Sequence, residues 1–460
     1  MWQQCLPAFS RQRSWELGGQ LALSNLINFG RHTITGALGA GGRQDADWSA
    51  AYRLFECQRF AVEHLFDVPL KTVIAALPPE HPVIASVDDT LLRKTGKKVS
   101  GASWRRDPLG PKFTTNFVWA QRWLQISLAL PEPNGRCRAI PVDFHHCPGA
   151  VKPGRNAGAD ELAEYAKRKK EMALPLRAKE RIELLRTRIP SSRKLVISGD
   201  GGYTNRTVCR NFPANTTLLG RVRKDAKLFA LPENINGCGR KRLYGKQLPT
   251  PENMRLDDSI SWREVNAATG NRMHTFKIKS IAAVRSQITG QRDLKLIIIQ
   301  PLRYRLTPKS KLLYRDPAYI ISTDPELTDA EILQWYLWRW EIELNFRDEK
   351  NILGVDEAMI RTPNAVASWA PFVVCSYAML LLAGSSAAEG NKIPDSAPKW
   401  QKSTPPARPS TNHYLTAMRQ EIYGLSWNNN LDGFKAHQQM SGKPLLFVPN
   451  IRTAILSARK

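Results

Sequence analysis

The order of strand-like and helix-like segments in the first half of the chain places the strongest limit on the fold. Three β-branched or alternating runs come first, a segment with the Glu, Lys, Arg, Leu and Ala content of a long helix follows, and a short apolar strand ends the series. These segments are, in order, 82–89 (PVIASVDD), 116–130, 137–144, 159–188 and 194–198 (KLVIS). The order predicts a mixed α/β fold.

The rest of the chain divides by composition. A strand at 318–322 precedes a long helix, 329–353, which begins with a capping box formed by Thr328 and Glu331. The apolar run 370–384 is interrupted and short for a bilayer, so we expect a buried helix and no membrane span. We expect a helical DNA-binding domain at 1–80, a core at 81–204, a β-rich insertion at 205–317, the second part of the core at 318–385, and a Pro-rich linker with a basic C-terminal region at 386–460.

The charge of the chain indicates a polyanionic partner. There are 67 Lys and Arg against 41 Asp and Glu, a formal net charge of +26. Such a surplus is matched most simply by nucleic acid, whose phosphates release condensed counterions when cations neutralise them. The segment 205–247 is especially basic and suits a wall that faces phosphates; a solvated basic loop is the alternative. Seven scattered cysteines and the lack of a signal-peptide pattern predict a reducing cytoplasm.

One face of the helix 329–353 carries an unusual polar stripe. At 100° per residue, Tyr336, Arg339, Glu343 and Lys350 fall within an arc of about 60°. Apolar residues flank the stripe on both sides, which predicts that it lies at the edge of a core or a cleft. The opposite face should be solvated; it consists of Glu341, Asn345, Asp348 and Glu349. An Arg–Glu pair that only stabilises the helix is the alternative interpretation.

Acidic residues at two other places in the chain could lie close to Glu343 in the folded protein. Asp88 and Asp89 end the first strand, and Asp200 follows the strand 194–198. Ligands gather at the carboxyl ends of strands in such folds, although an Asp there is often a turn residue or a helix cap. Three converging carboxylates would suit phosphodiester chemistry, because Mg²⁺ prefers oxygen ligands and a pair of ions can activate the attacking oxygen and stabilise the leaving one.

These residues match a known pattern. The chain resembles the DDE insertion-sequence transposases with a Tyr-(2)-Arg-(3)-Glu-(6)-Lys signature, and Tyr336, Arg339, Glu343 and Lys350 reproduce that spacing without a gap. The segment 86–101 (SVDDTLLRKTGKKVSG) is similar to the block of the family with the first Asp. The segment 197–205 (ISGDGGYTN) is similar to the block with the second.

The resemblance implies a fold and a reaction. The fold is a ribonuclease-H-like core, a mixed five-stranded sheet with helices, interrupted by a β-rich insertion. The reaction is cut-and-paste transposition: hydrolysis at an element end, hairpin formation, reopening of the hairpin, and joining of the 3′-OH to target DNA. It also implies double-stranded DNA as the partner, both terminal inverted repeats and target, and a homodimer on paired ends.

The resemblance also implies roles for single residues. Asp89, Asp200 and Glu343 would hold two Mg²⁺ ions, with Mn²⁺ able to substitute; Asp89 is favoured by its position before Thr90, and Asp88 is its neighbour or substitute. Tyr336, Arg339 and Lys350 would bind phosphates. Trp340 or Trp262 would stack a flipped base, although both could be core residues. Lys94, Lys97 and Lys98 suit backbone contacts, with a solvated loop as the alternative.

Two other functions fit the same residues. A metal-dependent nuclease of this fold would cut without joining, and a domesticated DNA-binding protein would have lost catalysis. The complete phosphate-binding set argues against the first function, and the intact acids argue against the second. The chain lacks the pattern of a phosphate-binding P-loop, so nothing indicates ATP hydrolysis. The triplet His145-His146-Cys147 lacks a second pair at zinc-finger spacing, so we expect no zinc site.

Overall fold

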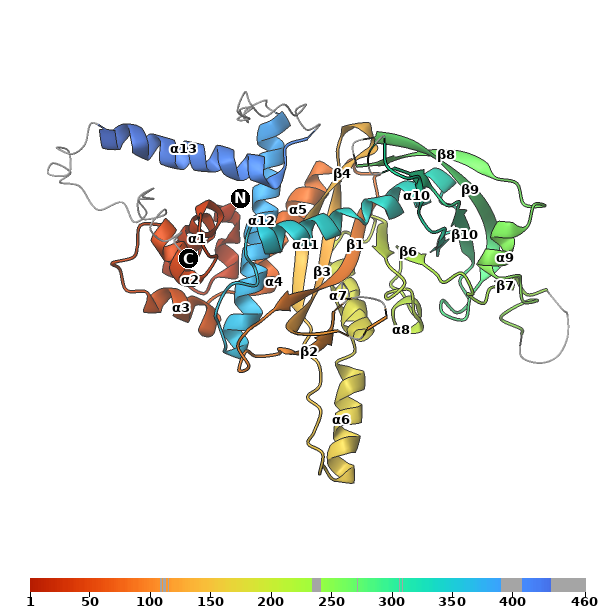
Figure 1. Ribbon diagram of the computed structural model, residues 1–460, viewed down its shortest axis with the longest axis horizontal. Coiled ribbons are helices and arrows are strands. Elements are labelled where there is room, and N and C mark those ends of the chain that lie inside the picture. The colour runs from red at the N-terminus through yellow and green to blue at the C-terminus, as the bar shows by residue number, and fades with distance from the viewer. Residues whose placement is uncertain are drawn as a thin grey trace.

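A large mixed sheet runs through the protein, with helices on both of its faces (Figure 1). The computed structural model describes residues 1–107, 110, 113–114, 116–233, 241–270, 272–305, 307, 309–389 and 408–431. Within these residues the sheet has eleven strands, in the order β2-β3-β1-β5-β6-β13-β10-β9-β7, with β4 paired to β3 and β8 paired to β9.

Five neighbouring strands have the ribonuclease-H arrangement, which confirms the predicted fold class. The central strand β1 is antiparallel to β3 and parallel to β5, while β4 extends the sheet beyond β3 and β6 extends it beyond β5. The bounds are β1 (Val83–Arg93), β2 (Ser103–Arg106), β3 (Phe117–Pro131), β4 (Cys137–His146), β5 (Leu195–Gly199) and β6 (Thr216–Arg221); the short helices η2 (Pro133–Gly135) and α8 (Arg206–Cys209) lie in the connections.

The fifth strand of the core differs from the predicted one. We expected the segment 318–322 in this position, but β6 pairs in parallel with β5, and 318–322 forms the next strand beyond it. The insertion then continues the same sheet. Its elements are β7 (Phe229–Ala230), α9 (Pro251–Leu256), β8 (Arg263–Thr269), β9 (Arg272–Arg285), β10 (Leu294–Ile299), β11 (Arg303–Tyr304), β12 (Leu313–Tyr314) and, back beside the core, β13 (Ala318–Ser322).

The helical segment predicted at 159–188 forms two helices. These are α6 (Ala159–Glu171) and α7 (Leu174–Arg188), and Pro175 lies in the first turn of α7. Proline is favoured there because it has no backbone N–H to donate and its φ is already helical. Helix α7 packs on the sheet through Ala178, Ile182 and Leu185, whereas α6 has no buried residue and projects from the body as an arm (Figure 1).

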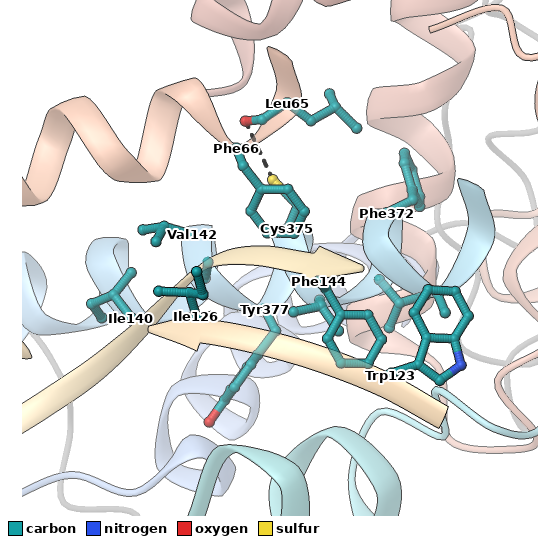
Figure 2. Close-up of a cluster of buried hydrophobic side chains, with 14 of the residues drawn as sticks. Leu65, Phe66, Trp123, Ile126, Ile140, Val142, Phe144, Phe372, Cys375 and Tyr377 are labelled. Atoms are coloured by element: carbon teal, nitrogen blue, oxygen red, sulfur yellow. Dashed lines mark hydrogen bonds between the residues drawn. The ribbon is translucent and has the colours of Figure 1, made fainter. Parts of the chain in front are cut away.

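The apolar run predicted at 370–384 belongs to a much longer helix. Helix α12 (Pro363–Glu389) passes between the N-terminal helices and the sheet. Figure 2 shows its residues Phe372, Cys375 and Tyr377 among aromatic and aliphatic side chains of β3 and β4, with the Cys375 thiol 3.4 Å from the carbonyl oxygen of Leu65. By length and composition α12 could cross a membrane, but 94% of its most apolar window is buried inside the protein.

The N-terminal helices and α13 pack against α12. The N-terminal region is helical: η1 (Trp2–Ala8), α1 (Gln12–Ile27), α2 (Ile34–Ala40), α3 (Ser49–Glu56), α4 (Val62–Leu65) and α5 (Asp67–Ala76). Helix α13 (Thr411–Leu431) contacts α1 and α12. Most of the predicted Pro-rich linker and the end of the basic tail lie outside the described residues.

Candidate active site

Three neighbouring strands present polar residues side by side at one edge of the core sheet. In the parallel ladders, Val87 pairs with Gly199 and Gly199 pairs with Gly220. Residues in register on parallel strands project to the same side of a sheet. The next residues on the three strands are Asp88, Asp200 and Arg221. The sheet therefore brings two predicted acids together and adds an arginine that the sequence did not single out.

The alternation of side chains along β1 separates Asp88 from Asp89. Ile84 belongs to the hydrophobic cluster that contains α10 residues, whereas Val83, Ala85 and Val87 belong to the cluster that contains α7 residues. Successive strand residues point to opposite faces. Asp88 therefore shares the face of Ile84, beneath α10 (Asp329–Trp338), and Asp89 lies on the opposite face. The next helix, α11 (Glu341–Asn351), carries Glu343.

The guanidinium of Arg339 joins Asp88 to Glu343. Its Nη1 atom lies 3.1 Å from Asp88 Oδ2, and its Nη2 atom lies 3.1 Å from Glu343 Oε1. The three side chains are largely shielded from solvent, at 13, 17 and 34% exposure for Arg339, Asp88 and Glu343. These two ion pairs fix the junction of α10 and α11 against the central strand β1.

Asp89 has a different set of partners. The Tyr203 hydroxyl donates to Asp89 Oδ1 at 2.7 Å, and Arg122 Nε lies 3.3 Å from Asp89 Oδ2. Both partners are on the face away from Arg339. The structure thus does not pair Asp89, the favoured first acid of the sequence analysis, with Glu343; Asp88 occupies that position, because strand alternation gives the two aspartates opposite directions.

The loop after β5 holds Asp200 in place. The backbone N–H of Gly202 donates to Asp200 Oδ1 at 2.7 Å, and the Thr204 hydroxyl donates to the Asp200 carbonyl oxygen at 2.9 Å. A Cβ atom at residue 202 would lie 3.0 Å from Asp200 Oδ1, and one at residue 220 would lie 2.3 Å from Thr204 Oγ1. Glycine at both positions allows this close approach.

The acids perturb one another. Burial raises the pKa of Asp88 to about 7, and the charges of Asp200 and Asp89 add to the shift, against the opposing effect of Arg339. Burial also raises the pKa of Asp89 and of Glu343, and Asp200 contributes in both cases. Asp200 is therefore within electrostatic reach of all three of the other carboxylates.

The donor chemistry of the site suits a hard divalent cation. Carboxylate oxygens are the preferred ligands of Mg²⁺. Among the described residues, however, no three acidic, histidine or cysteine side chains are grouped closely enough to hold a metal ion. Arg339 lies between Asp88 and Glu343 at the point where a shared cation would be needed.

The polar stripe predicted on one continuous helix is carried by two helices. Between α10 and α11, four backbone N–H groups donate to the carbonyl oxygen three residues back; they belong to Arg339, Trp340, Ile342 and Glu343. Such bonds tighten a turn to 3₁₀ geometry. Arg339 and Tyr336 stay adjacent, with the guanidinium carbon 5.9 Å from the ring centroid. Lys350 is half-buried at the far end of α11, and burial lowers its pKa.

The face of α11 predicted to be solvated is buried instead. Asn345, Asp348 and Glu349 are at most 7% exposed. Asn345 donates to the Ala139 carbonyl oxygen at 3.1 Å, and the Thr411 hydroxyl donates to Asp348 Oδ2 at 2.6 Å. The prediction was wrong because α12 and the start of α13 cover this face. Both oxygens of Glu349 are buried without a hydrogen-bond partner among the described residues.

The predicted aromatic and lysine contacts are dispersed. Trp340 is 56% exposed, so it is not a core residue. Trp262 is half-buried in the insertion, with its ring 4.7 Å from the ammonium of the buried Lys279. Lys94 donates to the carbonyl oxygen of Asp356 at 2.7 Å, and burial lowers its pKa to about 8. Its neighbours Lys97 and Lys98 are exposed.

A cavity of about 930 Å³ opens beside Asp200 and runs along the insertion. It is lined by Arg221, Arg223 and Lys224 of the predicted basic segment, together with Tyr319. Arg221 also lowers the pKa of Tyr336, against the larger raising effect of burial, so it lies within electrostatic reach of the stripe. The run TTLLGR at 216–221 carries the apolar strand signal that would have pointed to Arg221. Arg240 of the same basic segment lies outside the described residues.

Comparison with known families identifies a family to which this chain is similar. The family model described as DDE superfamily endonuclease matches residues 4–285. This region contains Asp88, Asp89 and Asp200 and ends before the helices that carry Arg339 and Glu343. No curated protein matches the chain.

Proposed function

The chain belongs to the DDE superfamily endonuclease family, and on this premise we propose that it is a DNA transposase that moves an insertion sequence by a cut-and-paste route. Membership implies a metal-dependent enzyme that acts on DNA. The finer proposal comprises hydrolysis at the element ends, hairpin formation and reopening, and joining of the 3′-OH to target DNA. A single observation carries it: Arg339 holds Asp88 and Glu343 together beside Asp200 on one face of the core sheet.

We propose Asp88, Asp200 and Glu343 as the metal-binding acids. Their carboxylates would hold two Mg²⁺ ions, with Mn²⁺ able to substitute, and Asp89 would support Asp88 from the neighbouring position through its pairs with Tyr203 and Arg122. When bound, such ions activate the attacking oxygen and stabilise the leaving one.

The cationic side chains around the acids would bind phosphates. Arg339 can offer its fork of N–H groups to a phosphate next to the scissile bond, and Tyr336 can donate from the adjacent turn. Arg221 stands in the same row as Asp200, exposed, and forms no side-chain hydrogen bond or ion pair with any residue that the structure describes. Lys350 would contribute a point charge from the far end of α11. Lys97 and Lys98 would contact the DNA backbone.

The proposed substrate sets the partners. The terminal inverted repeats and the target would be double-stranded DNA, and two element ends would be paired by a homodimer. Such a protein would act in the cytoplasm, on the nucleoid. The excess of cations over acids supports a polyanionic partner.

The test uses linear DNA that ends in the terminal inverted repeats found beside the reading frame. The wild-type protein with Mg²⁺ should nick, form hairpins and join ends to a target plasmid. The variant Glu343→Gln should bind the ends with unchanged affinity and lose cleavage, whereas Glu264→Gln, which removes an exposed carboxylate from β8, should keep it. Cleavage by Glu343→Gln at the wild-type rate would contradict the acid assignment; cleavage without hairpins or joining would identify an endonuclease instead.

A further inference from the structure

We propose that the arm formed by α6 and the loop before it binds the sugar-phosphate backbone of a DNA duplex whose strand is held at the acids. The arm comprises residues 148–171, between β4 and α7. Helix α6 has no buried residue, and the arm projects from the body of the protein (Figure 1). The choice of DNA as the ligand rests on the proposed function.

The arm leaves the core sheet at the edge that carries the acids. The last residue of β4, His146, pairs with Trp123 of β3, and Trp123 pairs with Thr90 of β1. The arm therefore begins level with a residue just beyond Asp88. A helix of 13 residues is about 20 Å long, which corresponds to about six base pairs of duplex DNA. A duplex bound at the acids therefore comes within reach of the arm.

The described part of the chain gives α6 little packing of its own. Leu162 is 49% exposed, and a Cβ atom added at Gly154 or Gly158 would meet no atom within 4 Å. A helix of this length is marginal in water by itself, because few hydrogen bonds offset the cost of starting it. A partner that covers one side of α6 would supply the missing packing.

The charges of α6 are segregated around the helix axis. At 100° per residue, its four acids fall within an arc of about 100°. These acids are Asp160, Glu161, Glu164 and Glu171. An arc of about 160° on the other side contains no acid. We call it the basic face, and it consists of three alanines together with Leu162, Tyr165, Lys169 and Lys170. Lys167 lies between the two arcs.

Helix stability explains the position of these charges along the axis but not around it. Acids in the first turn and cations in the last turn stabilise any helix through its dipole, and α6 has both. That effect depends on the distance from the helix ends, so it does not separate acids and lysines by face.

The cations on the two faces also differ in their partners. Arg168 lies among the acids, where its Nε atom is 3.0 Å from Glu164 Oε1. Lys169 and Lys170 are exposed on the basic face, and neither ammonium forms an ion pair or hydrogen bond with any residue that the structure describes. The basic face therefore carries the cations that are free to bind a ligand.

The composition of the basic face selects a polyanion. Alanine side chains are short, so the helix can approach a backbone closely while the lysines reach its phosphates. A membrane surface would need a broad apolar face, and Leu162 is the one large aliphatic residue of α6. A second copy of the chain carries the same net charge of +26, so it would be repelled at long range. Duplex DNA bound at the neighbouring acids meets each requirement.

The test measures DNA binding by fluorescence anisotropy in buffer without divalent metal, so that no cleavage occurs. Two duplex probes have the same length: one contains a terminal inverted repeat, and the other has a scrambled sequence. The variants are Lys170→Gln and the double variant Lys169→Gln/Lys170→Gln. The matched control is Arg168→Gln, which removes the same charge as Lys170→Gln from the opposite face of α6. All of these side chains are exposed, so the thermal midpoints should equal that of the wild type.

We expect Lys170→Gln to lower the affinity about threefold and the double variant to lower it about tenfold, while Arg168→Gln stays within about 1.5-fold of the wild type. Both probes should lose affinity by the same factor, because backbone contacts carry no sequence information. For the double variant, the slope of the logarithm of the association constant against the logarithm of salt concentration should be shallower by about two.

Two results would overturn the proposal. Equal losses for Arg168→Gln and Lys170→Gln would show an effect of net charge and not of one face. Unchanged affinity in the double variant would exclude DNA, and a changed sedimentation coefficient of that variant would then identify a second copy as the occupant. The test needs neither cleavage nor a specific sequence, so its failure differs from failure of the transposase assignment: a protein that binds duplex DNA through the arm but does not cut would still pass.

Discussion

The substitution Asp88→Asn removes one negative charge from the acidic site while it preserves the shape of the side chain. It leaves Arg339 paired with Glu343 alone. Asp89→Asn is the matched control, because it makes the same change one residue away on the other face of β1. Both variants remove the same charge, so a difference between them reports which face of β1 the side chain lies on.

The effect of Asp88 on stability can be worked from its pKa. Burial raises the pKa of Asp88 from 3.8 to about 7 in the folded protein. A carboxyl group that holds its proton more tightly in the folded state loses stability as the pH rises from about 4 to about 7, and the loss is complete above the folded value. A shift of this size lowers the free energy of unfolding by on the order of 4 kcal/mol once the carboxyl group is ionised. Asp88→Asn has no such loss at any pH.

The assay compares apparent thermal midpoints near pH 4.5 and near pH 8, with and without saturating Mg²⁺. Without metal, Asp88→Asn should match the wild type at the acidic pH and unfold on the order of 5 °C higher at the basic pH. A ligand that binds only the folded state stabilises it, so Mg²⁺ bound at the proposed acids should raise the midpoint of the wild type and of Asp89→Asn at the basic pH. It should leave Asp88→Asn unchanged, and this variant alone should lose cleavage.

Two results would refute the reasoning. If Asp88→Asn is no more stable than the wild type at the basic pH, then burial does not raise the pKa of Asp88 as the structure indicates. If Asp89→Asn loses the Mg²⁺ response and cleavage while Asp88→Asn keeps them, the first metal ligand is Asp89, and the face assignment of β1 does not describe the active state.

Three further predictions address other parts of the site. Arg339→Lys keeps the charge but cannot bridge two carboxylates with a planar fork, so single-turnover cleavage should fall about 100-fold with little change in DNA affinity; an unchanged rate would deny Arg339 its bridging role. The logarithm of the DNA association constant, measured by fluorescence anisotropy, should fall with the logarithm of salt concentration with a slope steeper than about −4, and a slope near zero would remove the charge argument. Burial raises the pKa of Glu349 to about 8, so the wild type loses stability as the pH rises from about 4.5 to about 8. Glu349→Gln should therefore have a higher thermal midpoint than the wild type near pH 9 and the same midpoint near pH 4.5.

The strands of the core could be predicted because each one has a recognisable pattern in its own short segment of sequence. The runs 82–89 and 194–198 each end at the acids, and each is buried on both faces, which gives a continuous apolar pattern that can be recognised without knowledge of the partners. The strand β6 has the same character but lies in a segment dominated by its positive charge, so it was absent from the prediction. With it, Arg221 was missed as a neighbour of Asp200.

The choice between Asp88 and Asp89 could not be made from local pattern. Both residues lie within β1, and which of them faces Glu343 depends on which face of the sheet receives α10 and α11. The same limit explains the buried side of α11: a helical wheel identifies a polar face, but it does not show that α12 and Thr411 will cover it. The sequence pattern gives the period with which side chains alternate, but which face becomes buried depends on the tertiary packing.

The position of Arg339 connects metal binding to DNA binding. In the structure its two terminal nitrogens are committed to the carboxylates of Asp88 and Glu343, and its Nε is buried without a hydrogen-bond partner among the described residues. A divalent cation that takes over those carboxylates would compete with the guanidinium for the same oxygen atoms. The released fork would then be free to bind a phosphate, so each ligand would favour the other by the same free energy. One arginine can therefore keep the acids together before the metal arrives and hold the DNA afterwards.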